Sequence, residues 1–167
     1  MLLSEFNRAK NNVIQVLLLN CVHIERWATA IPEQCPFATK IALLNYARKQ
    51  ALSWSWDEIL SALNTHPRIG EKKAQAKLSE KEKAFSDREQ SFLAPNQITL
   101  DALFKGNVAY EKKFGFIFLI KASGLNSEQI LTALNDRLVN DIETEKQIVH
   151  QQLLEIALLR LEQEVQA

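Results

Sequence analysis

Apolar residues recur along most of this chain at intervals of three and four, the spacing that places them on one face of an α-helix. Runs that alternate apolar and polar residues, as half-buried strands do, are scarce. Glycine and proline, which interrupt helices, occur only 4 times each in 167 residues. The pattern therefore predicts an all-α protein, a single compact multi-helix domain over residues 1–167 with short connections.

Capping signals and prolines divide this pattern into segments. We expect helices over about residues 4–9, 13–20, 22–30, 37–52, 56–64, 80–92, 97–113, 127–138 and 142–165. The predicted helix starts use Ser4, Asn11 or Asn12, Pro36, Ser127 and Asp141, and the third helix should stop before Pro32. Two Ser-x-x-Glu spacings predict capping boxes, at Ser55–Glu58 and Ser79–Glu82.

The stretch FGFIFLIKASG (114–124) does not fit this scheme. It is mostly apolar and rich in rigid or β-branched residues, so it is either an extended buried segment or the tail of the helix before it. Periodicity alone does not decide between these two. Tyr110, Phe114 and Phe116, which lie in and before it, are predicted core residues.

Charge and cysteine content narrow the functional classes. The 20 basic and 20 acidic residues cancel, which disfavours nucleic-acid binding. The most apolar window, residues 13–24, is too short and interrupted to cross a bilayer, and we find no targeting signal at either end. Cys21 and Cys35 lack metal-ligand spacing, and without a leader they should be reduced. We therefore expect a cytoplasmic protein that binds neither membrane nor nucleic acid, with no metal site.

The sequence NTHPRIGEKKA (64–74) brings several polar groups together at the end of a predicted helix. Pro67 restricts the backbone of His66, which stands where the helix dipole favours a protonated ring. This placement suits a proton donor near neutral pH. A lone histidine in a loop is more often an ordinary surface residue, and the residues alone leave both interpretations open.

Two further charged groups occupy unusual positions. Arg160 continues the apolar stripe of Val149, Leu153 and Ile156 on the last helix. There it needs a carboxylate or an anionic ligand, unless its stem packs on the core and its head reaches water. Glu89 is either a site carboxylate or part of a solvated helix face.

Several separated motifs together resemble one family. They are HPRIGE (66–71), SDREQ (86–90), NVAYEKKFGFIFLIKASG (107–124) and EIALLRLEQ (155–163), with ERWA (25–28) and CPF (35–37) before them. In this order and spacing they resemble the OHCU decarboxylases, the 2-oxo-4-hydroxy-4-carboxy-5-ureidoimidazoline decarboxylases of urate breakdown. The resemblance implies an all-α homodimer that converts OHCU to (S)-allantoin without a metal or an organic cofactor.

The resemblance also implies roles for individual residues. The catalytic set would be His66, Glu89 and Arg160. The substrate-binding set would be Pro67, which shapes the histidine loop, with Ser86, Asp87, Arg88, Gln90, Phe118, Leu119, Ile120, Lys121 and Ala122. The last five would offer backbone groups to the substrate, and Lys121 stands where a small or apolar residue is expected.

Two alternative functions follow from the same residues. One is a non-enzymatic helical interaction module, in which the apolar last helix is a docking surface and HPRIG a capped loop. The other is an enzyme of the same fold that acts on a related ureido or imidazoline compound.

Overall fold

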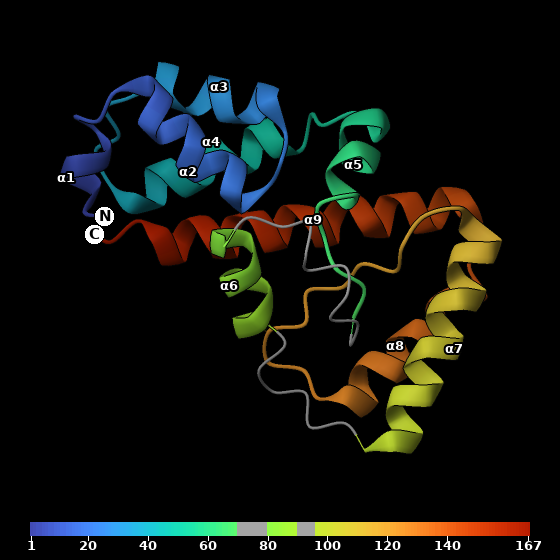
Figure 1. The fold of residues 1–167 in the computed structure, drawn as a ribbon. Coiled ribbons are helices and arrows are strands. Elements are labelled where there is room, and N and C mark those ends of the chain that lie inside the picture. The colour runs from blue at the N-terminus through green and yellow to red at the C-terminus, as the bar shows by residue number, and fades with distance from the viewer. Residues whose placement is uncertain (70–79, 90–95) are drawn as a thin grey trace. The chain divides into compact units, whose positions relative to one another are not determined.

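The computed structural model describes residues 1–69, 80–89 and 96–167, and the regular structure in these ranges is helical (Figure 1). The helices are α1 (Leu3–Phe6), α2 (Asn11–Cys21), α3 (Glu25–Glu33), α4 (Lys40–Ala51), α5 (Trp56–Leu63), α6 (Glu80–Glu89), α7 (Gln97–Phe114), α8 (Ser127–Leu138) and α9 (Ile142–Glu164). Extended pairing in the described ranges amounts to an isolated bridge between Leu2 and Gln166. The predicted all-α fold class is confirmed.

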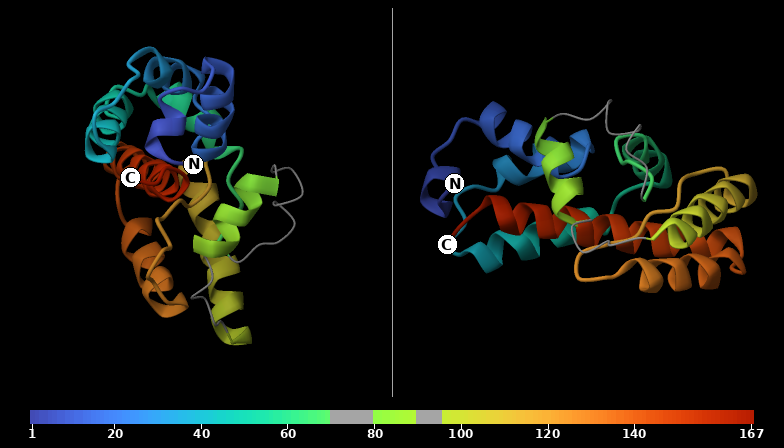
Figure 2. Two further views of the ribbon diagram at one scale, coloured as in Figure 1. Left: turned by 90° about the vertical axis from the view of Figure 1, so that its left-hand side faces the viewer. Right: turned by 60° about the horizontal axis from the view of Figure 1, so that its bottom comes forward.

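The chain divides into two compact units. Unit 1 comprises Met1–Ala62 together with Leu153–Ala167, and unit 2 comprises Leu63–Gln152. Helix α9 therefore contributes its first part to unit 2 and its last part to unit 1. In unit 1 the two termini lie beside each other, as both views of Figure 2 show. The amino group of Met1 donates to the carbonyl of Glu164 at 3.0 Å.

Unit 1 is organised around a buried tryptophan. Helix α2 packs against α3, and α3 against α4. Trp27 of α3 is 1% exposed, and its indole N–H donates to the carbonyl of Ala47 on α4 at 2.9 Å. Trp54 meets it edge to face, with ring centroids 6.0 Å apart. The indole thus fills the core while its polar atom is satisfied, as a buried tryptophan requires.

Unit 2 depends on a close approach of α7 and α8, which lie side by side in Figure 1. Gly106 of α7 faces the fully buried Leu134 of α8. A β-carbon at position 106 would lie 2.4 Å from Cδ2 of Leu134. Any side chain at position 106 would therefore require Leu134 to move.

Replacing Gly106 with alanine should destabilise the protein by about 1–2 kcal/mol. Overpacking of a dense core typically costs about 1–3 kcal/mol, and the better helix propensity of alanine returns up to about 1 kcal/mol. Urea unfolding of Gly106→Ala measures the difference. In a Leu134→Ala background, where the obstructing side chain is gone, the same substitution should be neutral or stabilising. Equal effects in both backgrounds would contradict the steric explanation.

Several predicted helix boundaries were correct. Ser55 and Glu58 form the predicted capping box: the Glu58 N–H donates to Ser55 Oγ at 3.1 Å, and the Ser55 N–H donates to Glu58 Oε1 at 2.9 Å. Asp141 accepts from the Thr144 N–H at 2.7 Å at the start of α9. The box at Ser79–Glu82 and the predicted end of that helix near residue 92 involve positions outside the described residues.

Other boundaries were wrong. Helix α3 includes Pro32 and ends at Glu33, because a proline in the last turn removes only one helical hydrogen bond. Pro36 does not open α4; it lies before the helix, after a cis peptide bond with Cys35, and Thr39 caps α4 by accepting from the Ala42 N–H at 3.0 Å. A side-chain cap satisfies an otherwise unpaired N–H, which a proline cannot do.

Three predicted caps also sit one or two positions away from the observed ones. Ser4 lies inside α1, whose N-cap is Leu2. Asn11 and Asn12 are the first two residues of α2, whose N-cap is Lys10. Asn126, rather than Ser127, caps α8, and it accepts from the Gln129 N–H at 2.8 Å. Leu2 and Lys10 make no side-chain capping hydrogen bond, so the starts of α1 and α2 are not marked by an N-cap side chain, whereas at α8 two neighbouring polar residues compete for one cap.

The ambiguous stretch after α7 is not helical. Helix α7 ends at Phe114, and Gly115 follows with a φ of 83°, a left-handed conformation that glycine adopts without strain. Residues 116–122 then form an irregular segment that leads toward α8. Phe116 and Phe118 from this segment and Tyr110 of α7 are buried together, as the core prediction for Tyr110 and Phe116 expected.

Candidate functional site

The loop that carries His66 is anchored in unit 2. His66 follows the end of α5, and its backbone N–H donates to the carbonyl of Leu63 at 3.1 Å. The residue is only 9% exposed, and Pro67 beside it is buried. An ordinary surface histidine would be exposed, so the burial of His66 argues against the surface alternative, and its catalytic role stays a prediction.

Helix α7 holds the next two residues of the loop. The guanidinium of Arg68 pairs with the carboxylate of Glu111 through two nitrogens, the second at 3.1 Å from Oε2. Asn107, 6% exposed, donates through its side-chain amide to the carbonyl of Ile69 at 3.3 Å. These contacts fix the backbone directly after His66 and Pro67.

Glu89 is the last residue of α6, also in unit 2, and it is partly exposed. Arg88 is exposed, and its guanidinium lies 5.0 Å from the ring centroid of the buried Phe85, within cation–π distance. Arg88 therefore has a structural contact in addition to its predicted role. Ser86 and Asp87 belong to α6, but their side chains are outside the described part of the structure, as is the whole of Gln90.

The predicted backbone-binding segment, residues 118–122, is largely buried. Phe118, Leu119 and Ala122 are at most 5% exposed, whereas Ile120 and Lys121 are partly exposed. The carbonyl of Leu119 accepts from Nη1 of Arg137 at 2.7 Å. The backbone N–H of Lys121 donates to Oε1 of Gln152 at 2.8 Å, so this group of the segment already has a partner in the protein.

Behind this segment lies a buried polar cluster that we define as Tyr110, Arg137 and Glu145. The Tyr110 hydroxyl and Nε of Arg137 both donate to Oε1 of Glu145 at 2.6 Å. Glu145 is fully buried and Arg137 is 7% exposed, with its guanidinium 4.5 Å from the ring centroid of Phe118. Burial, together with the hydrogen bond to Glu145, strongly raises the pKa of Tyr110, so its hydroxyl remains a donor.

Sequence reasoning missed Arg137 and Glu145, although a signal was present. Arg137 stands seven residues after Ile130 and three after Leu134, both fully buried on α8. Glu145 stands four residues before the buried Val149 on α9. Arg160 stands out in the sequence because it is a charge on an apolar helix stripe. The same criterion, applied to α8 and to the start of α9, identifies Arg137 and Glu145.

Arg160 lies on the part of α9 that belongs to unit 1. It is 3% exposed, and its Nη1 donates to the backbone carbonyl of Cys21, the last residue of α2, at 3.1 Å. The alternative in which its head reaches water is therefore wrong. His66, Glu89 and residues 118–122 all belong to unit 2, so the meeting of Arg160 with them around a substrate stays a prediction.

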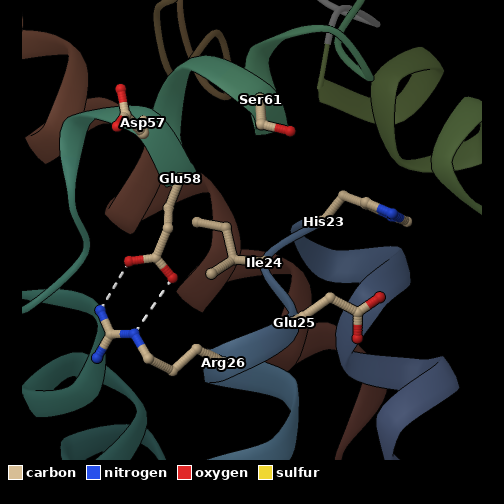
Figure 3. Close-up of a pocket in the computed structure, with 7 residues that line it drawn as sticks. All are labelled: His23, Ile24, Glu25, Arg26, Asp57, Glu58 and Ser61. Atoms are coloured by element: carbon tan, nitrogen blue, oxygen red, sulfur yellow. Dashed lines mark hydrogen bonds and ion pairs between the residues drawn. The ribbon is translucent and has the colours of Figure 1, made fainter.

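Unit 1 also contains an open pocket of about 550 Å³ (Figure 3). Its lining residues are His23, Ile24, Glu25, Arg26, Asp57, Glu58 and Ser61, none of which was a predicted site residue. Arg26 donates to both carboxylate oxygens of Glu58, at 2.8 and 3.2 Å, whereas the side chain of His23 points away from this pair. The hydrogen bond with Arg26 holds the pKa of Glu58 below its ordinary value of 4.5.

The Arg26–Glu58 pair should add a pH-dependent component to stability. Because the folded pKa of Glu58 is depressed, its contribution is fully present above pH 4.5 and is lost as the pH falls through the folded value. Glu58→Gln keeps the capping oxygen and removes the charge, and it should cost about 0.5–1 kcal/mol at pH 7 and progressively less below pH 4.5. Urea unfolding between pH 7 and pH 3 measures this. Glu25→Gln removes a charge from the same pocket without breaking the pair and should change little; an equal pH dependence in both variants would contradict the assignment.

The described ranges contain no group of three or more histidine, cysteine, aspartate or glutamate side chains placed to hold a metal ion. Within the same ranges, no helix combines the length and the apolar character that crossing a membrane requires.

The sequence of the chain is similar to that of known proteins. The sequence model of the OHCU decarboxylase family matches residues 7–162. The chain is 34% identical over 103 residues, 61% of its length, to the "Uric acid degradation bifunctional protein TTL" of Arabidopsis thaliana. It is 28% identical over 131 residues, 77% of its length, to the "Uric acid degradation bifunctional protein" of Bacillus sp. (strain TB-90). The matched regions cover 32% and 25% of those two proteins, so the chain corresponds to a third or less of their length.

Solved structures support the same fold. A crystal structure of OHCU decarboxylase in the presence of (S)-allantoin superposes with a TM-score of 0.73 at 24% identity, covering 93% of this chain and 98% of that one. A crystal structure of (S)-allantoin synthase gives a TM-score of 0.74 at 18% identity, covering 99% of this chain and 54% of the other. With a sequence match that extends over nearly its whole length, the chain belongs to the OHCU decarboxylase family.

Proposed function

We propose that this protein decarboxylates OHCU to (S)-allantoin in urate breakdown, without a metal or an organic cofactor. Family membership supports this reaction, and the observation that carries it is the burial of His66 in an anchored loop. The contacts of Arg68 and Asn107 hold the chain directly after His66 against α7.

The substrate itself can accept the electrons that decarboxylation releases. In OHCU the carbon that carries the carboxylate also carries a hydroxyl group and adjoins a ring C=N. When the bond to the carboxylate breaks and carbon dioxide leaves, its electron pair forms a C=C bond to the ureido-bearing carbon, and the former C=N pair passes to the ring nitrogen, which takes up a proton. A proton then adds to the ureido-bearing carbon, and the hydroxyl gives up its own proton to become a carbonyl. The protein needs only to orient the carboxylate, stabilise displaced charge and deliver the proton to one face.

The predicted site residues match these tasks. His66 would be the acid/base group near the hydroxyl and carboxylate, and it would steer protonation. Glu89 would accept hydrogen bonds from ureido or ring N–H groups. Arg160 would bind a carbonyl or carboxylate oxygen with its planar fork. Backbone groups of residues 118–122 would bind the remaining oxygens, and Pro67 with Ser86–Gln90 would shape the surrounding surface.

Three further properties belong to the same proposal. The family match runs from residue 7 to residue 162 through both units, which supports a single functional domain. The family resemblance implies a homodimer, and the sequence predicts a cytoplasmic location; sedimentation equilibrium of the purified chain tests the first of these.

Freshly prepared OHCU provides the direct test. Spontaneous decay yields racemic allantoin, which has no circular dichroism, whereas the enzyme should produce the dichroic signal of the (S) enantiomer together with faster loss of OHCU. A signal and a rate equal to those in buffer would refute the proposal and favour the interaction module. Turnover of a related ureido compound in place of OHCU would identify an enzyme of different specificity.

A further inference from the structure

We propose that Arg137 and Gln152 are positioning residues, which fix the two peptide groups on either side of Ile120 so that Ile120 presents its N–H and C=O to the substrate. This inference rests on the proposed function and deepens it. It assigns a specific pair of backbone groups to substrate recognition and names the side chains that orient them.

The first peptide group is held by a rigid guanidinium. Nη1 of Arg137 donates to the Leu119 carbonyl at 2.7 Å, while its Nε donates to Glu145 and its guanidinium carbon lies 4.5 Å from the ring centroid of Phe118. Glu145 in turn accepts from Tyr110 and from the side chain of Asn140, the latter at 3.1 Å. Since each of these partners is itself constrained, the guanidinium of Arg137 is held in one position, and the carbonyl of Leu119 must orient toward it.

The second peptide group is held from α9. Oε1 of Gln152 accepts from the Lys121 N–H at 2.8 Å, and Gln152 is itself partly buried. The two hydrogen bonds therefore act on residues 119 and 121, directly before and after Ile120. Neither bond involves a side chain of the segment, so both control only the orientation of its backbone.

Peptide planarity transmits this control to Ile120. The described peptide bonds of this segment are trans, so the C=O and N–H of one peptide unit point in opposite directions. Fixing the Leu119 carbonyl toward Arg137 directs the Ile120 N–H away from Arg137. Fixing the Lys121 N–H toward Gln152 directs the Ile120 carbonyl away from Gln152.

Ile120 is the residue best placed to use these groups. It is partly exposed while Phe118, Leu119 and Ala122 are buried, and within the described ranges its N–H and C=O have no hydrogen-bond partner in the protein. A donor and an acceptor on one residue complement an –NH–C(=O)– edge. Such edges occur in the ring and in the ureido group of the proposed substrate, so the expected ligand class is a ureide.

Gln152→Met tests the inference with little disturbance of packing, because methionine has a similar length but cannot accept this hydrogen bond. We expect KM for OHCU to rise by about tenfold, the effect of one hydrogen bond, with a smaller change in kcat. Gln152→Glu keeps an acceptor oxygen and should restore KM to within about twofold. Gln147→Met, an exposed glutamine to methionine change on the same helix, is the matched control and should behave as wild type.

A second readout follows the backbone itself. Amide hydrogen exchange of a peptide covering residues 116–122 should accelerate in Gln152→Met and remain unchanged in Gln147→Met. Arg137→Lys, which keeps a positive charge beside Glu145 but loses the planar fork, should lower kcat/KM by at least tenfold and accelerate exchange in the same peptide.

The outcomes separate this inference from the proposed function. Failure of the wild-type chain to form (S)-allantoin refutes the function, and the positioning role with it. Wild-type turnover with unchanged KM in Gln152→Met refutes the positioning role alone. Equal losses in Gln152→Met and Gln152→Glu, or in Gln147→Met, would likewise overturn it, because the acceptor oxygen would then not be the cause.

Discussion

His66→Ala should form (S)-allantoin about a hundredfold to ten-thousandfold more slowly than wild type, the usual contribution of a general acid or base. The imidazole is the group proposed to transfer the proton in a site where the substrate accepts its own electrons. The anchors of the loop, Arg68 to Glu111 and Asn107 to Ile69, do not involve this side chain and should keep the backbone in place. Initial rates followed by circular dichroism measure the loss.

Two companion variants make this result specific. His66→Asn keeps a polar side chain but removes the titrating ring, so its loss should fall in the same range. His23→Ala removes an exposed imidazole from the unit 1 pocket and should keep wild-type turnover. A near-wild-type rate in His66→Ala, with normal far-ultraviolet dichroism and urea unfolding, would exclude His66 as the acid/base group.

Arg160→Met should lower kcat/KM on the order of a hundredfold. Loss of a buried, charge-assisted contact to an anionic ligand costs about 2–5 kcal/mol, and each 1.4 kcal/mol is about tenfold. Methionine fills the space of the arginine stem, and the loss of the hydrogen bond to the Cys21 carbonyl should itself cost about 1.5–3 kcal/mol of stability. Steady-state kinetics with OHCU and urea unfolding separate the two effects.

Arg48→Met is the matched control for this substitution. Arg48 is also in unit 1 and pairs with Glu155 at 2.8 Å, but its side chain is 44% exposed. An exposed ion pair contributes about 0–1 kcal/mol, so this variant should lose little stability and no activity. Full activity in Arg160→Met, with only reduced stability, would mean that Arg160 serves to anchor the end of α2 and does not bind substrate.

Helix positions were predictable because burial and capping leave local patterns. The capping box at Ser55–Glu58 and the cap at Asp141 were correct because each depends on residues three apart in sequence. The start of α4 was wrong because two local rules competed, and the side-chain oxygen of Thr39 outweighed the preference of Pro36 for a first turn. The local sequence is compatible with a helix opened by Pro36 and with one capped by Thr39, and tertiary packing decides which of them forms.

The candidate site was predictable in part for a different reason. Periodicity marks a charge such as Arg160 as buried, and its burial is confirmed. Periodicity does not identify the partners of a buried charge. Arg137 lies on α8, but its partners are Glu145 on α9 and the carbonyl of Leu119 in the irregular segment. Those contacts depend on how α8, α9 and the segment pack, which no spacing along the chain encodes.

Three neighbouring positions of α7 bear on both proposed substrate-facing segments. Asn107 and Glu111 hold the histidine loop, and Tyr110, on the same face, belongs to the cluster that orients the segment at Leu119. A shift or rotation of this one helical turn would displace the proposed acid/base group and the proposed backbone donor together. Directed changes of specificity are therefore better made in the residues proposed to face the substrate than in α7, where a single substitution would disturb both proposed parts of the site at once.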